Sequence, residues 1–426
     1  MPKVPPTPLY IYSRQPTKQI YLAYQLLTTV FFRLPIWFLL AVPKSLRPRP
    51  TWPLKRVLFL RLFRHFMYIT SQCVFWAYAC ERLTLIWRRT GPIYTTPNHF
   101  AITPGSGTEG IWIPPADKFM TKSLKSMAEV SKVLPTHIPG YWVHRKGSNI
   151  PFGSIPVAGK KVILSCHGGG YIRYSGHPDD PTATIAKGLL KNFSSVQRLF
   201  CVEYRLSKTS AGAFPAALLD ALAAYVYLVN DIGFLPANII VEGDSAGGNL
   251  ALALTRYLVE SQNNAEGVPV PSPPSALVLF SPWADMGLSH FTFGSIAAKN
   301  SATDYISGMA EVDYARRMFC GQNGKDSVSV NPYMSPASID PRMKIDFKGF
   351  PRTFIVAGGA EVLLGVIRTL KERMARDLGD NKVGYYEATE GIHDYVAFTE
   401  WEPERTETYK AIAEWLANPV QARFSK

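Results

Sequence analysis

The chain has 426 residues, of which 47% are hydrophobic and 12% aromatic, and this composition excludes a largely disordered protein because it can supply a large apolar core. Its 46 Lys and Arg residues exceed its 32 Asp and Glu residues, which gives a formal net charge of +14. Residues 1–80 hold eleven of the basic residues and no acidic one, and long apolar runs separate these basic residues. The sequence shows no nucleic-acid-recognition motif, so we expect this positive charge to contact a membrane surface and not a nucleic acid.

A basic tail, residues 1–18, precedes an apolar segment, residues 19–43. The run is about long enough to cross a bilayer. Arg33 and Pro35 interrupt it near the middle, where a charge costs roughly 3 kcal/mol on insertion scales. We therefore expect membrane attachment by a helix that either spans the bilayer once or lies in its interface. A mitochondrial presequence and a cap helix buried on the rest of the protein are the alternatives.

Residues 44–130 form a second basic and aromatic region. Within it, residues 57–87 carry Arg61 and Arg64 among Leu, Phe, Tyr and Trp side chains. This pattern is typical of an amphipathic helix, which would cover the core, form a lid or contact the membrane.

From residue 131 to residue 426, strands are predicted to alternate with helices. Short runs rich in β-branched and other apolar residues predict strands at 161–166, 198–204, 238–242, 276–280, 353–357 and 382–386. Helices are predicted at 211–229 and 247–260. This alternation indicates an α/β fold with a mostly parallel sheet covered on both faces. Residues 284–350 lack a clean period and are predicted to be a cap insertion.

The sequence Gly-Asp-Ser-Ala-Gly, residues 243–247, follows one predicted strand and opens the next helix. A G-x-S-x-G sequence in this context is a nucleophile elbow, a strained turn that exposes its serine above the sheet. Ser245 is therefore the predicted nucleophile. Ala246 follows it, and its backbone N–H is predicted to stabilise an oxyanion.

A second glycine-rich loop, His-Gly-Gly-Gly-Tyr at residues 167–171, follows the strand at 161–166. Glycine lets the backbone turn its N–H groups toward a developing negative charge. We expect Gly168 and Gly169 to donate to the same oxyanion as Ala246. His167 is expected to anchor the loop, and Tyr171 is a candidate for the wall of the substrate pocket.

The base and the acid of such a site should follow the last strands in chain order. His393 comes shortly after the strand at 382–386 and is the predicted base. Glu361 comes just after the strand at 353–357, so we expect its carboxylate to orient the imidazole of His393. Asp340, Asp346 and Glu390 have poorer positions relative to the strand ends.

Together these motifs resemble the hormone-sensitive-lipase-like family of α/β-hydrolases, over about residues 130–420. The resemblance rests on HGGGY, Glu203–Leu206, Phe214–Ala217, GDSAGGN, Ser281–Trp283 and Glu390–Asp394. It implies an eight-stranded sheet with a helical cap, no cofactor and no metal. It also implies that Ser245, Glu361 and His393 form a triad, with Gly168, Gly169 and Ala246 as oxyanion donors. The family usually has aspartate at the position of Glu361 and a second aspartate four residues later, where this chain has Gly365.

With its apolar N-terminal segment, the chain is similar to the membrane-bound branch of the family, which includes arylacetamide deacetylases and fungal steryl acetyl hydrolases. This resemblance implies an endoplasmic-reticulum protein with a luminal catalytic domain. The basic residues that follow the apolar segment favour the cytosolic side instead. Asn192-Phe193-Ser194 is a glycosylation sequon, which would fit a luminal domain.

The sequence thus predicts a membrane-attached serine carboxylesterase that removes acetyl or short acyl groups from apolar alcohols, such as sterols or other isoprenoids, through an acyl-enzyme. An amide or formamide hydrolase that uses the same residues is one alternative. A non-catalytic receptor for an apolar ligand is the other. The sequence leaves the oligomeric state open.

Overall fold

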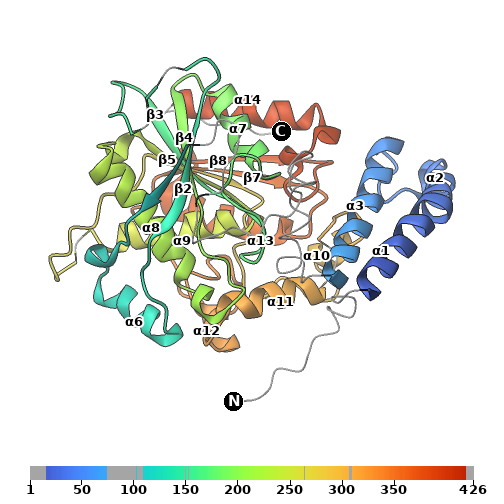
Figure 1. Cartoon of the computed structure of the whole chain (residues 1–426), viewed down its shortest axis with the longest axis horizontal. Helices are drawn as coiled ribbons and strands as arrows, with labels where there is room; N and C mark the ends of the chain where they lie inside the picture. Colours follow the sequence, from blue (N-terminus) through green and yellow to red (C-terminus); the bar gives the residue numbers. More distant parts are fainter. Residues whose placement is uncertain are drawn as a thin grey trace.

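The computed structural model describes residues 16–73, 102, 109–148, 150–151, 153–262, 264–306 and 309–418. An eight-stranded sheet with the order β1-β2-β4-β3-β5-β6-β7-β8 forms its centre (Figure 1). The strands are β1 Glu109–Ile113, β2 Ile138–His144, β3 Lys161–Cys166, β4 Val196–Val202, β5 Ile239–Asp244, β6 Ala276–Phe280, β7 Arg352–Gly358 and β8 Val383–Ala388. β2 pairs antiparallel with β1 and β4, and all other pairs are parallel. The predicted α/β fold is confirmed.

Helices cover both faces of the sheet, which explains why the central strands are continuous apolar runs. In β3, Val162 and Leu164 belong to one apolar cluster and Ile163 to the other, as alternation along a strand requires. The first cluster includes side chains from α6 Lys122–Ser131, α8 Ala216–Val226, α9 Ala246–Glu260 and α13 Leu364–Leu378. The second includes side chains from α7 Ala183–Asn192 and α14 Glu404–Ala417.

The sheet begins earlier in the chain than we expected. β1 pairs with β2 from Glu109 onward, so the boundary expected at residue 131 falls too late. Both strands are antiparallel and lie toward one edge of the sheet. Neither contains the β-branched apolar run that is typical of a buried parallel strand, and β2 also contains Pro139 and Gly140. Each of the six predicted strands overlaps one of β3 to β8.

Three helices lie between β6 and β7, within the segment predicted to be a cap insertion. They are α10 Ile296–Asn300, α11 Met309–Cys320 and α12 Lys325–Val330. Phe319 of α11 stacks on Tyr171, with ring centroids 3.9 Å apart, so this segment packs against the glycine-rich loop at 167–171.

The described part of the N-terminal region, residues 16–73, is mostly helical. α1 Thr17–Thr28, a π-helical turn at Thr29–Arg33 and α2 Leu34–Ala41 follow one another without a break, and α3 Leu54–Cys73 comes next. α2 and α3 lie side by side at one side of the molecule (Figure 1). The helix Thr17–Ala41 is long and apolar enough to cross a membrane by length and composition. α3 starts three residues before the stretch 57–87 that was expected to be an amphipathic helix and overlaps its first part, and residues 74–87 lie outside the described residues.

Arginines from the N-terminal region donate hydrogen bonds to the catalytic domain. Arg56 forms a two-pronged ion pair with Glu404, with N–O distances of 2.8 and 2.6 Å. Arg49 donates to the main-chain oxygens of Gly359 and Thr389, at 2.8 and 2.9 Å. We call these two arginines the arginine clamp. Part of the positive charge that we expected to meet a membrane is therefore used inside the protein.

Candidate active site

The turn between β5 and α9 has the geometry of a nucleophile elbow. Ser245 has φ 52° and ψ −114°, a strained conformation for a residue with a side chain. A Cβ at Gly243 would lie 2.3 Å from the oxygen of Gly247, and one at Gly247 would lie 1.9 Å from the oxygen of Cys166. Both positions therefore require glycine, and the tight turn presents Ser245 at the carboxyl end of the central strand.

His393 and Glu361 come together at the same end of the sheet, after β8 and β7. Glu361 Oε2 lies 3.2 Å from His393 Nδ1, and Glu361 Oε1 accepts from the N–H of Gly358 at 3.1 Å. Both side chains are buried. The contact is the one that we expected of an orienting acid and a base, although the acid is glutamate and not the usual aspartate.

Burial and neighbouring charges both shift the pKa values of this pair. It raises the pKa of Glu361 to about 7, against the opposing effect of the hydrogen bond from His393. Burial alone would lower the pKa of His393, but the carboxylates of Asp394 and Glu361 together raise it well above the ordinary value. Two carboxylates, those of Glu361 and Asp394, thus contact the two ring nitrogens of one imidazole.

Asp304, in the segment between α10 and α11, holds the two loops of this pair in place. Its carboxylate accepts from the N–H of Val362 at 2.8 Å, next to the acid, and from the N–H of His393 at 3.3 Å. The side chain is fully buried. Sequence reasoning missed Asp304 because the segment around it has no periodic pattern that would place it near the strand ends.

The glycine-rich loop offers different donors from those expected. The N–H of Gly168 donates to Asp244 Oδ1 at 3.0 Å, and a Cβ at Gly168 would meet the same carboxylate. The expectation that Gly168 donates to an oxyanion is therefore wrong, because its N–H already has an acceptor. Gly169 and Gly170, with φ of 103° and 63°, instead line the cavity that holds Ser245.

The donors that remain are next to Ser245 in the chain or line the same cavity. Ala246 is the first residue of α9, so its N–H has no partner within the helix. Among the described residues, the N–H groups of Gly169 and Gly170 also lack a hydrogen-bond partner. Ala246 and Gly169 therefore remain the candidate oxyanion donors, and Gly170 becomes a candidate in place of Gly168.

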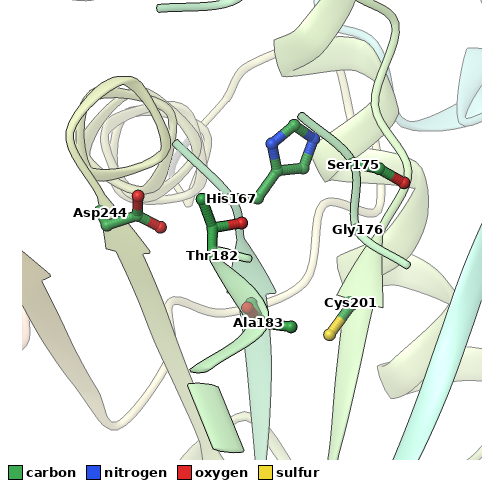
Figure 2. Close-up of a pocket in the computed structure, with 8 residues that line it drawn as sticks. His167, Ser175, Gly176, Thr182, Ala183, Cys201 and Asp244 are labelled. Atoms are coloured by element: carbon green, nitrogen blue, oxygen red, sulfur yellow. The ribbon is translucent and has the colours of Figure 1, made fainter. Parts of the chain in front are cut away.

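His167 anchors the glycine-rich loop as expected. Its ring stacks on Tyr204 at a centroid distance of 4.2 Å, and Tyr204 donates through its hydroxyl to the main-chain oxygen of His167 at 2.6 Å. Behind this loop, His167, Thr182, Ser175 and Asp244 surround a small polar pocket of about 10 Å³ (Figure 2). Such a space fits one water and no substrate.

A larger cavity of about 330 Å³ opens onto Ser245 and His393. Apolar side chains of its wall come from several separate parts of the chain. They include Phe63 and Met67 from α3, Ile172 and Ile185, Trp283, Phe291, Ile306 and Val312 in and beside the cap segment, Leu363, and Ala397 and Phe398. The N-terminal helix α3 thus contributes directly to the space where a substrate would bind.

Two other candidate residues lie elsewhere. Tyr171 is fully buried, donates to Asn249 Oδ1 at 2.8 Å and is not among the residues that line the large cavity, so the expectation that it forms the pocket wall is wrong. Asn192 is exposed at the end of α7, where a glycan would meet no steric obstacle from burial. Within the described part of the chain, no group of three or more His, Cys, Asp or Glu side chains is arranged to hold a metal.

Comparisons with known proteins agree with this geometry. Residues 163–397, more than half of the chain, match the sequence profile of a protein family that is described as having an alpha/beta hydrolase fold. The chain belongs to this family. Its relatives and structural neighbours place it among the hormone-sensitive-lipase-like members, and it is a carboxylic ester hydrolase.

The esterase LipU of Mycobacterium tuberculosis is 28% identical over 62% of this chain and 80% of its own length. Steryl acetyl hydrolase 1 of Saccharomyces cerevisiae is 23% identical over 55% of this chain and 50% of its own length. Among solved structures, a hormone-sensitive lipase from a metagenome library is 26% identical, with a TM-score of 0.51, and the match covers 66% of this chain and 81% of that one.

Proposed function

We propose that the protein is a membrane-associated serine carboxylesterase that hydrolyses acetyl or other short acyl esters of apolar alcohols. The observation that carries this proposal is the meeting of three elements at one edge of the sheet. The strained Ser245 and the imidazole of His393 line one apolar cavity, and Glu361 contacts Nδ1 of this imidazole. Gly169 and Gly170 line the same cavity, and their backbone N–H groups have no partner among the described residues.

The chemistry follows from these positions. Ser245 Oγ attacks the ester carbonyl while His393 takes its proton, and the N–H groups of Ala246, Gly169 and Gly170 stabilise the resulting oxyanion. The protonated imidazole then gives this proton to the departing alcohol, which leaves an acyl-enzyme. Water, deprotonated by the same imidazole, releases the carboxylic acid and restores Ser245.

The wall of the cavity supports an apolar alcohol as the leaving group. Side chains such as Phe63, Met67 and Phe398 offer apolar surface, and a space of about 330 Å³ suits a small to medium molecule. A yeast relative is named steryl acetyl hydrolase, which supports acetate esters of sterols or other isoprenoids as candidate substrates.

The helix Thr17–Ala41 supports membrane association, by spanning once or by lying in the interface. More than half of the large apolar side chains that the described residues expose lie between Ile20 and Leu46. The charge of Arg33 is partly satisfied, since its guanidinium donates to the hydroxyls of Thr28 and Thr29. This lowers the cost of placing Arg33 in an apolar layer. An endoplasmic-reticulum membrane is the proposed location, on a side that glycosylation of Asn192 would reveal.

Substitution of the nucleophile tests the enzymatic part. Ser245→Ala should abolish hydrolysis of p-nitrophenyl butyrate and labelling by a fluorophosphonate probe, while thermal unfolding stays that of a folded protein. Full activity of this variant would refute the proposal. An ester-versus-anilide substrate panel on the unaltered protein separates the carboxylesterase from the amide-hydrolase alternative.

A further inference from the structure

Asp394 is a carboxylate in the large cavity that the proposed mechanism does not use. It directly follows His393 and has a left-handed backbone, with φ 48° and ψ 36°. Its N–H donates to Ser281 Oγ at 3.1 Å, which fixes the turn. The residue is 7% exposed and lines the cavity together with Ser245.

The two oxygens of this carboxylate have different surroundings. Asp394 Oδ2 lies 3.0 Å from His393 Nε2, the nitrogen that would face the nucleophile. Asp394 Oδ1 is buried without a hydrogen-bond partner. Within the described residues, His393 is the ion-pair partner of Asp394, and neither lysine nor arginine pairs with it. A buried carboxylate oxygen without a donor is costly, so a donor brought by a ligand would be bound strongly.

The position of Asp394 relates it to one side of the scissile bond. In the proposed mechanism His393 Nε2 hands its proton to the oxygen of the departing alcohol. At this proton-transfer step, a carboxylate 3.0 Å from Nε2 would lie beside the alcohol part of the ester. A donor on the carbon next to the ester-bearing carbon would be within reach of this carboxylate.

We infer that Asp394 is a substrate-recognition site that selects esters whose alcohol carries a hydrogen-bond donor, a hydroxyl or an ammonium, on the neighbouring carbon. The inference rests on the proposed function and narrows its substrate class to monoesters of vicinal diols and amino alcohols with an apolar remainder. When the donor binds the carboxylate, Asp394 releases Nε2, so the same contact frees the base to face Ser245.

Two pairs of butyrate esters test this on the full chain. 2-Hydroxyethyl butyrate is compared with 2-methoxyethyl butyrate, in which a methyl group removes the donor. 2-(Dimethylammonio)ethyl butyrate is compared with 3-methylbutyl butyrate, its uncharged carbon analogue. We expect kcat/KM to be at least about tenfold higher for the donor ester in one or both pairs, as a hydrogen bond to a charged group implies. The pair that shows the preference identifies the donor.

Two variants tie the preference to Asp394. Asp394→Gly suits the left-handed backbone and removes the carboxylate, so the preference should vanish. Asp394→Asn keeps the shape and removes the charge, so the preference should fall at least about threefold even if the glycine variant does not fold. Asp326→Asn changes a side chain that is 92% exposed; it is the matched control and should keep the preference for the donor ester.

Equal kcat/KM within both pairs would overturn the inference, as would a preference that survives in Asp394→Gly. These results differ from failure of the proposed function. In that case the unaltered protein would hydrolyse neither these esters nor p-nitrophenyl butyrate, and Ser245 would not react with a fluorophosphonate.

Discussion

The helix Thr17–Ala41 and the helix α3 are similar in composition but differ in their surroundings. Both are apolar and basic, and neither contains an acidic residue. The first exposes most of its large side chains, whereas Val57 and Leu60 of α3 are buried against the catalytic domain and Arg56 is paired with Glu404. An acid-free, basic and apolar composition therefore does not by itself predict a membrane contact; what decides is whether the rest of the fold offers a matching surface.

The largest expected effect is on membrane binding, and it comes from negative charges placed on the exposed helix Thr17–Ala41. Phe31 and Leu39 are 66% and 68% exposed, so Phe31→Asp with Leu39→Asp changes few folded contacts. Each aspartate costs about 3 kcal/mol at the centre of a membrane helix. The double variant should lose its flotation with phospholipid vesicles. Ile155→Asp with Leu235→Asp, at apolar positions that are 78% and 66% exposed on the catalytic domain, is the control and should still float.

The next effect should be on stability and not on membrane binding. Arg56→Met removes one partner of an ion pair whose arginine side chain is only 7% exposed, which costs about 3 kcal/mol. We expect a Tm several degrees lower by calorimetry, with unchanged flotation. Lys55→Met makes the same change of charge at an exposed neighbour and should leave the Tm nearly unchanged. An equal Tm loss in both variants would contradict the arginine clamp.

A smaller effect concerns the contribution of α3 to the cavity. Phe63 lies 4.9 Å from Tyr305 and 5.3 Å from Phe398 by ring centroids, and it lines the cavity. Phe63→Ala should raise KM for esters of bulky apolar alcohols about tenfold, since lost apolar contact costs 1–3 kcal/mol, and should change turnover of p-nitrophenyl acetate much less. Leu62→Ala, on the exposed side of α3, is the control. If both variants behave alike, α3 does not form part of the substrate site.

The smallest expected effect is on the pH dependence of ester hydrolysis, which the active-site residues determine and the two N-terminal helices do not. His393 must be neutral at Nε2 to accept a proton, and its pKa is raised well above 6.5 because the nearby carboxylates outweigh burial. Ester hydrolysis should therefore rise with pH along a limb above 6.5. Asp394→Asn should move this limb to lower pH by about one unit, because a neighbouring negative charge is lost. The ionisable groups around His393 are Glu361, Asp394, Asp304, Asp244 and Tyr305.

The rate of fluorophosphonate labelling of Ser245 against pH gives this limb without a substrate. A limb that stays in place in Asp394→Asn would mean that Asp394 does not influence the protonation of the base. Since thermal unfolding can be followed over the same pH range, a shift caused by partial unfolding would be visible.

Chain order made much of the site predictable. Parallel strands bring their carboxyl ends to one edge, so Ser245, Glu361 and His393 could be placed there from the strands that precede them. Asp304 could not, because its position depends on how a segment without periodicity folds back over that edge. Gly168 was assigned wrongly because three consecutive glycines look alike in sequence. Which N–H faces the cavity is decided by backbone angles and by the carboxylate of Asp244.

Whether a strand could be predicted from the sequence also depended on where it lies in the sheet. β3 and β6 have the predicted bounds because fully buried parallel strands require continuous apolar runs. β1 and β2 were missed because antiparallel strands near an edge tolerate Pro, Gly and exposed side chains such as Trp112. Local pattern thus predicts the centre of the sheet better than its margin.

Through Arg49, the N-terminal region also contacts the loops of the active site. It donates to Gly359, two residues before Glu361, and to Thr389, four residues before His393. One guanidinium therefore bridges the loops that carry the proposed acid and the proposed base. A truncated form that lacks the apolar helix Thr17–Ala41 should accordingly be cut between residues 43 and 49, because a cut after Arg49 would also remove a brace of the active site.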